Sequence, residues 1–171
     1  MVEISFDGLV EAHAGELLGF LQRMLQDRQE AEDVLQESFL RAYRAFPRLN
    51  ADAHHRGWLY RIAINTARTQ LGRRRPESLP PEALDDLAGE ENTPEDQHMQ
   101  GDLMAAVYQA VEALPQQQRA ALLLRMFQGL EYDVVAEALG CNSETARAHV
   151  YQAVRKLRSR FAAEPGHGRS R

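Results

Sequence analysis

The sequence predicts an all-α protein made of two small helical domains joined by a flexible acidic linker. Apolar residues recur at helical spacing almost everywhere outside residues 76–98, and no run shows the alternation with a period of two that a strand requires. Residues 76–98 instead combine four prolines with two acidic clusters and few large apolar side chains. A chain of 171 residues is long enough for two domains of modest size.

The first domain, residues 1–75, is expected to contain three helices. The clearest one covers about residues 31–46, where apolar side chains form a single stripe and Pro47 prevents further helix. Helices predicted over about residues 6–26 and 57–73 can pack against this stripe. The stripe consists of Ala31, Val34, Leu35, Phe39, Ala42, Tyr43 and Phe46.

The second domain, residues 99–161, is expected to contain four helices, and residues 162–171 are expected to form a disordered tail. Pro115 and Gly140 mark breaks between helices, and Asn142 or Ser143 can cap the last one. The two helices around Gly140 have the spacing of a helix-turn-helix. The four helices are predicted over about residues 99–113, 116–127, 132–139 and 143–161.

Charge is distributed in blocks of alternating sign, although the net charge is -5. Residues 1–40 contain 9 acids and 2 bases, whereas residues 41–75 contain 9 arginines and 1 acid. Residues 76–115 contain 10 acids and no base, and residues 116–171 contain 9 bases and 5 acids. Because the local charge decides which partner a surface attracts, the acidic total does not exclude nucleic-acid binding.

Several functional classes are not supported by the sequence. A single cysteine, Cys141, excludes an internal disulfide, and no apolar run approaches the roughly 18 residues of a membrane span. The amino terminus lacks the basic and apolar stretches of a secretory signal, so we expect a cytoplasmic protein. His54 and His55 are adjacent and would diverge on a helix, and no glycine loop for phosphate is present. We therefore expect a protein that is not an enzyme, with no metal, cofactor, membrane insertion or small-molecule substrate.

Two predicted helices carry cationic faces suited to nucleic acid. On the helix over residues 57–73, Arg61, Asn65 and Arg68 share one face, and the chain continues into Arg73, Arg74 and Arg75. Cations neutralise phosphate, and an amide can hydrogen-bond the edge of an unstacked base. Trp58 favours core packing over base stacking, because large aromatic residues mainly contribute buried area.

The last helix presents a polar side opposite its apolar residues, formed by Glu144, Arg147, Ala148, Tyr151, Arg155 and Arg158. Arg147 and Gln152 suit base edges in a major groove. Phosphate contacts, which carry no sequence information, are assigned to Arg155, Lys156, Arg158 and Arg160. For this pattern alone, the alternative is a solvated basic face on an ordinary helical hairpin.

The motifs and their order resemble those of the extracytoplasmic function group of bacterial RNA polymerase sigma factors, over about residues 8–161. AEDVLQESF begins at Ala31 and is followed by WLYRIAIN, which ends at Asn65, and by the run RRR. LPQQQR ends at Arg119, and the helix-turn-helix ends with VRKLR. Each motif is modest evidence, but the combination is specific.

The resemblance implies a three-helix sigma region 2 and a four-helix sigma region 4. It assigns Asp33, Gln36, Glu37 and Arg41 to binding of core RNA polymerase. It implies that the loop over residues 48–56 and Asn65 bind the minus-ten promoter element, and that the helix around residues 147–152 binds the minus-thirty-five element. It also implies an anti-sigma factor as a regulatory partner. The full set of expected DNA-binding residues is Arg61, Asn65, Arg68, Arg73, Arg74, Arg75, Arg119, Arg147, Ala148, Tyr151, Gln152 and Arg155.

Two other interpretations remain open from the residues. The chain could be a free-standing helix-turn-helix regulator whose first three helices bind a signal or a second subunit. It could also be a sigma-like decoy that binds an anti-sigma protein without recognising promoters. The first alternative leaves WLYRIAIN and the arginine face unexplained, and the second keeps the fold but loses the DNA contacts.

Overall fold

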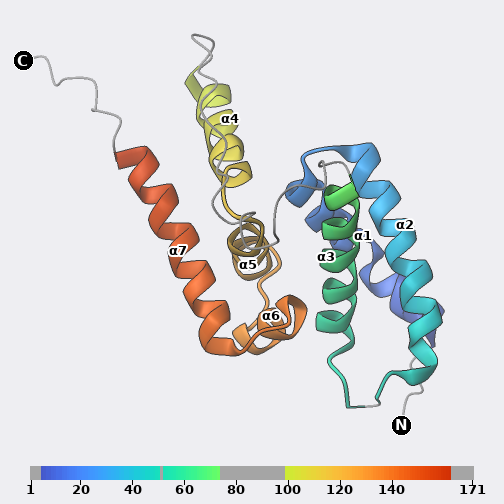
Figure 1. Cartoon of the computed structure of the whole chain (residues 1–171). Helices are drawn as coiled ribbons and strands as arrows, with labels where there is room; N and C mark the ends of the chain where they lie inside the picture. Colours follow the sequence, from blue (N-terminus) through green and yellow to red (C-terminus); the bar gives the residue numbers. More distant parts are fainter. Residues whose placement is uncertain (1–4, 51, 74–98, 163–171) are drawn as a thin grey trace, which may run out of the picture.

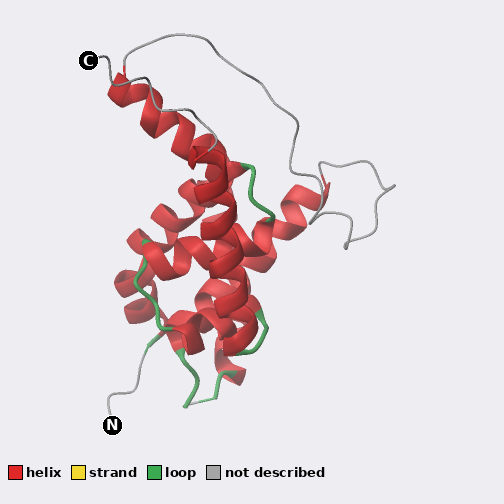
Figure 2. Ribbon diagram, turned by 90° about the vertical axis from the view of Figure 1, so that its left-hand side faces the viewer, coloured by secondary structure: helices red, strands yellow, loops and turns green. Residues whose placement is uncertain are grey.

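The structure, a computed structural model, describes residues 5–50, 52–73 and 99–162, and every regular element in these residues is helical (Figure 2). None of the helices described is long and apolar enough to cross a membrane. The α-helices are α1 (Phe6–Leu25), α2 (Arg28–Ala45), α3 (His55–Arg73), α4 (Met99–Glu112), α5 (Gln116–Met126), α6 (Tyr132–Leu139) and α7 (Ser143–Ala162), and a 3-10 turn covers Phe46–Arg48.

Helices α1, α2 and α7 begin at side-chain caps. Ser5 Oγ accepts a hydrogen bond from the Gly8 N–H at 3.1 Å, and Asn142 Oδ1 accepts one from the Thr145 N–H at 2.7 Å. Asp27 caps α2 in the same way, so this helix begins at Arg28, three residues before the predicted start. The missed turn is polar, and apolar periodicity does not detect it.

Helices α1, α2 and α3 pack together and bury the predicted stripe (Figure 1). Phe20 of α1 and Tyr60 of α3 meet edge to face, with ring centroids 5.2 Å apart, at the centre of this half. Trp58 packs against a smaller cluster around Leu9 and Leu59, in agreement with the expected core role. Tyr43 differs from the prediction, because it lies at the edge of the stripe and is 64% exposed.

Helices α5, α6 and α7 form the core of the second half (Figure 1). Gly140 ends α6 with a φ of 69°, and its N–H is directed to the last carbonyls of that helix. The left-handed backbone conformation of Gly140 turns the chain into α7, as the helix-turn-helix spacing predicts. On α7, Ala146, Val150 and Ala153 are buried, which leaves the opposite side to solvent.

The two halves share one buried core. A single apolar cluster includes Phe20 and Ile64 of the first half together with Leu123 and Val135 of the second. Helix α3 packs along α6, and α1 packs against α5 (Figure 1). The proposed linker, residues 76–98, and residues 163–171 of the proposed tail lie outside the described residues, whereas Ala162 ends α7.

We expect alanine substitution to have opposite effects at two glycines. At Gly140, the positive φ is strained for any residue with a Cβ, so Gly140→Ala should lower the free energy of unfolding by about 1 kcal/mol. Gly15 lies inside α1, and a Cβ at this residue would meet only open space, so Gly15→Ala should raise the free energy of unfolding by about 0.5–1 kcal/mol. Urea unfolding followed by circular dichroism measures both, and the same sign at the two sites would contradict the assignment.

Candidate functional site

The polar face of α2 brings all four predicted polymerase-binding residues together. Asp33, Gln36, Glu37 and Arg41 line one shallow hollow, which is completed by Gln70 and Arg73 of α3. Arg41 Nε donates to Glu37 Oε1 at 2.7 Å, and this hydrogen bond lowers the pKa of Glu37. The hollow therefore presents fixed charges of both signs.

An apolar groove continues from this hollow along α1 and α2. Phe6 and Tyr43 meet at its edge with ring centroids 5.3 Å apart, and Leu40 is 53% exposed beside them. Gln36 and Leu40 line both depressions, so the charged and apolar parts form one continuous surface. This apolar groove was not predicted from the sequence. Its signal in the sequence was Leu40, an apolar residue that lies outside the predicted stripe.

The predicted cationic face of α3 is present. Arg61, Asn65 and Arg68 are all exposed, while Ala63 and Thr66 are buried on the other side of the helix. Arg73 is exposed too, but it lines the hollow beside α2 rather than extending this face. Arg74 and Arg75 lie outside the described residues.

The exposed side of α7 carries five of the predicted DNA-binding residues: Arg147, Ala148, Tyr151, Gln152 and Arg155. The guanidinium carbon of Arg147 lies 4.6 Å from the ring centroid of Tyr132, at the start of α6. Arg125 of α5 lies over the same ring at 4.8 Å. The apolar pattern of α6 includes Tyr132 only as a core residue and gives no sign that its ring orients Arg147.

Two of the predicted DNA-binding residues, Gln152 and Arg119, form side-chain hydrogen bonds with other parts of the protein. Gln152, which is exposed, accepts a hydrogen bond at 2.9 Å from Nε2 of the half-buried Gln118 of α5. Arg119 belongs to α5, so it is separate from the exposed face of α7. Its Nη1 donates to the Met24 carbonyl at 2.9 Å, and its Nη2 donates to the carbonyls of Glu112 and Leu114. Arg119 therefore connects the two halves, and burial lowers its pKa.

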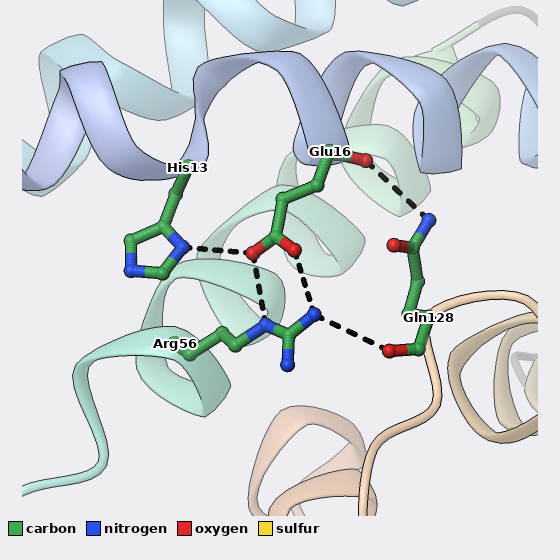
Figure 3. Close-up of polar contacts among 4 residues, drawn as sticks. All are labelled: His13, Glu16, Arg56 and Gln128. Atoms are coloured by element: carbon green, nitrogen blue, oxygen red, sulfur yellow. Dashed lines mark hydrogen bonds and ion pairs between the residues drawn. The ribbon is translucent and has the colours of Figure 1, made fainter.

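A second polar contact between the halves surrounds Arg56, at the start of α3 (Figure 3). Its Nε and Nη2 donate to the two carboxylate oxygens of Glu16 at 2.9 and 2.6 Å. The same Nη2 donates to the Gln128 carbonyl at 3.3 Å. His13 Nδ1 lies 2.7 Å from Glu16 Oε1. We call His13, Glu16, Arg56 and Gln128 the junction cluster.

The junction cluster alters the acidity of its members. Burial by itself raises the pKa of Glu16, but hydrogen bonds from Arg56 and His13 outweigh this effect and hold it below its ordinary value of 4.5. The hydrogen bond to Glu16 raises the pKa of Arg56. Burial also raises the pKa of the neighbouring Tyr60 hydroxyl. At neutral pH the cluster thus contains a carboxylate and a guanidinium that stabilise each other.

The fold combines exposed cationic faces on α3 and α7 with a mixed-charge hollow on α2, an arrangement typical of the class of helical nucleic-acid-binding proteins that also bind a protein partner. Comparisons with known proteins agree with this class. Residues 9–77 match the family model described as Sigma-70 region 2, and residues 104–157 match that of Sigma-70, region 4. The chain belongs to the sigma-70 family of RNA polymerase sigma factors, in its extracytoplasmic function group.

Individual relatives cover most of the chain. The RNA polymerase sigma-H factor of Pseudomonas aeruginosa is 38% identical in an alignment of 158 residues that covers 87% of this chain and 82% of that protein. The ECF RNA polymerase sigma-E factor of Haemophilus influenzae is 33% identical over 87% of this chain and 83% of its own length. The sigma factor RpoE from Bartonella quintana, solved with the anti-sigma factor NepR, has a similar fold, with a TM-score of 0.68, 21% identity and coverage of 94% and 98%.

We expect Glu16→Gln to lower the free energy of unfolding by about 1–2 kcal/mol at pH 7, because it removes charge from hydrogen bonds that are only partly exposed to solvent. A lowered pKa stabilises the folded state above the unfolded value, here about 4.5, and this contribution is lost as the pH falls through the folded-state pKa. The difference between variant and wild type should therefore shrink at acidic pH.

Urea unfolding of both proteins across a series of pH values measures this difference. Glu11→Gln is the matched control, because Glu11 is an exposed acid on the same helix. It should change the free energy by less than about 0.5 kcal/mol. A difference between wild type and Glu16→Gln that stays constant down to the lowest pH would contradict the assignment of the ion pair.

Proposed function

We propose that this protein is an alternative sigma factor that binds core RNA polymerase and directs promoter-specific initiation of transcription. The observation that carries the proposal is the presence on one chain of a mixed-charge face on α2 and of exposed cationic faces on α3 and α7. Its membership of the sigma-70 family supports this combination of roles. The protein acts through polymerase and is not itself the catalyst.

The α2 hollow and its apolar groove form the proposed polymerase-binding surface. Asp33 and Gln36 are exposed, while the Glu37–Arg41 pair is fixed by a hydrogen bond of 2.7 Å. Charged groups of this kind set the orientation and the rate of association, and the adjacent exposed Leu40 and Tyr43 can contribute buried apolar area. We assign orientation to the four polar residues and affinity to the apolar groove.

The α3 face is proposed to bind the minus-ten element as separated strands. Arg61 and Arg68 lie one turn before and almost one turn after Asn65, so two cations flank one amide. Neutralisation of phosphate by the arginines would position the strand, and the Asn65 amide would recognise an unstacked base. We retain Arg74 and Arg75 as further phosphate contacts, whereas Arg73 lines the proposed polymerase-binding hollow.

The α7 face is proposed to bind the minus-thirty-five element as duplex. Arg147 lies in the second turn of α7 and is held over the Tyr132 ring, so its position is set before DNA binds. An ordered arginine loses less conformational freedom on binding a guanine edge. Ala148, Tyr151 and Gln152 lie beside it, and Arg155 follows one turn after Tyr151, where it would contact phosphate.

Control by an anti-sigma factor is part of the proposal. The Bartonella quintana protein of similar fold is bound to its anti-sigma factor NepR in the solved structure. A partner that covers the faces of α2, α3 and α7 would withhold them from polymerase and promoter. We place these events in the cytoplasm, where polymerase and DNA are found.

Purified chain mixed with core polymerase and genomic promoter fragments tests the proposal. A sigma factor should yield start-site-specific transcripts that core polymerase alone does not make. A chain that fails to bind core polymerase but binds duplex DNA would favour the free-standing regulator. A chain that binds core polymerase or an anti-sigma factor without producing transcripts would favour the decoy.

We expect Arg147→Ala to weaken promoter binding by about 10- to 100-fold and to relax discrimination at one position of the minus-thirty-five element. Arg158→Ala, on the same helix, should weaken binding less than Arg147→Ala does, and by about the same factor for every sequence. It should also reduce the slope of the logarithm of the binding constant against the logarithm of the salt concentration by about one. Holoenzyme binding to a library of promoter variants at several salt concentrations separates the two effects. Equal loss on all sequences for Arg147→Ala would remove its assigned role in base recognition.

A further inference from the structure

The two base-recognition candidates on α7, Arg147 and Gln152, are both held by side chains of other helices. The guanidinium of Arg147 lies over the ring of Tyr132 in α6. Gln152 Oε1 accepts its hydrogen bond of 2.9 Å from Nε2 of Gln118, which belongs to the first turn of α5. The contact with Gln118 decides which end of the Gln152 amide is left to meet DNA.

The burial of Gln118 fixes the direction of this hydrogen bond. Its Oε1 is enclosed by protein and has no hydrogen-bond partner among the described residues, whereas its Nε2 is directed to the exposed Gln152. The reverse orientation would enclose an NH2 group with two unpaired N–H groups. Such buried N–H groups are rarer in proteins than a buried carbonyl oxygen without a partner. Gln118 is therefore the donor of the pair, and Gln152 is the acceptor.

This hydrogen bond turns and polarises the Gln152 amide. Gln118 occupies the oxygen end of the amide, which leaves the two N–H donors of Gln152 Nε2 for the major groove. An amide oxygen that accepts a hydrogen bond also makes the N–H groups of the same amide stronger donors. Gln152 thus meets DNA as a donor.

Base edges in the major groove differ in what such a donor can meet. Guanine exposes two acceptors, N7 and O6, whereas adenine exposes the acceptor N7 beside the donor N6. A glutamine that binds adenine with both ends of its amide needs its oxygen for N6. In this protein Gln118 competes for that oxygen, so guanine is the better partner for Gln152.

We propose that Gln118 is a specificity-determining residue of this protein, because it positions the Gln152 amide as a donor and thereby gives guanine preference over adenine at the base pair that Gln152 meets. This inference rests on the proposed function, in which α7 binds the minus-thirty-five element as duplex. Gln118 is a positioning residue, which acts on the base through Gln152.

The test uses holoenzyme assembled from the full chain and core polymerase. It is bound to promoter fragments in which each position of the minus-thirty-five element carries each base in turn. The position at which Gln152→Ala removes the base preference is the one that Gln152 reads. At this position the wild type should bind guanine at least about fivefold more tightly than adenine. Equal or tighter binding of adenine, or no position that responds to Gln152→Ala, would overturn the inference.

Gln118→Glu should reverse the preference. An ionised carboxylate only accepts hydrogen bonds, so Gln152 must turn its NH2 group toward residue 118 and present its oxygen to the groove. The ratio of the affinity for guanine to the affinity for adenine should fall at least about tenfold. The added negative charge weakens binding of all sequences alike, so it cancels in this ratio. A ratio equal to that of the wild type would contradict the role of Gln118.

Two controls separate the contact from the charge. Gln109→Glu makes the same charge change at an exposed glutamine of α4 and should leave the ratio unchanged. In a Gln152→Ala background, Gln118→Glu should also leave the ratio unchanged, because its effect passes through Gln152. A shift in either control would trace the effect to charge alone and overturn the inference.

Gln118→Met covers the case in which a carboxylate at this half-buried position prevents folding. It removes the donor, keeps a side chain of similar length and adds no charge, so the preference for guanine should fall at least about threefold. An undiminished preference would count against the inference. A wild-type holoenzyme that forms no specific promoter complex would instead overturn the proposed function.

Discussion

The packing of α3 between two sets of neighbours is the constraint on which the rest of the structure depends. One side of α3 is buried against α1 and α2, and another is buried against α6. Small residues such as Gly57, Ala63 and Ala67 allow this double approach, because they leave room for backbones and side chains on both sides. Only the remaining side is exposed, and that side carries Arg61, Asn65 and Arg68.

The same constraint explains how a chain of net charge -5 keeps several of its arginines exposed on two helix faces. Arginines on the exposed sides of α3 and α7 remain in solvent, where they can attract phosphate. Arginines at the contact between the halves, Arg56 and Arg119, are instead bound to a carboxylate and to main-chain carbonyls. Position relative to the shared core, rather than residue type, thus separates the exposed arginines of α3 and α7 from the arginines that connect the two halves.

Sequence patterns predicted the helices closely, because the apolar stripe of a helix has a period near 3.6 residues whichever element the helix packs against. They missed the start of α2, where Asp27 rather than an apolar residue determines the boundary. They also missed the contact between the halves, since Val135 and Ile64 have the pattern expected for the core of each half alone. Glu16 and Arg56 are 40 residues apart, and nothing local indicates their pairing. Arg119 was assigned to DNA by resemblance, and nothing local in the sequence indicates its hydrogen bond to the Met24 carbonyl, 95 residues away.

The length of the connecting chain is compatible with the proposed promoter contacts. The centres of the two promoter elements are about 25 base pairs apart, or about 85 Å along duplex DNA at 3.4 Å per base pair. The 25 residues from 74 to 98 can span at most about 90 Å. The covalent connection therefore permits both faces to reach their elements, with the dimensions of the two halves as additional reach.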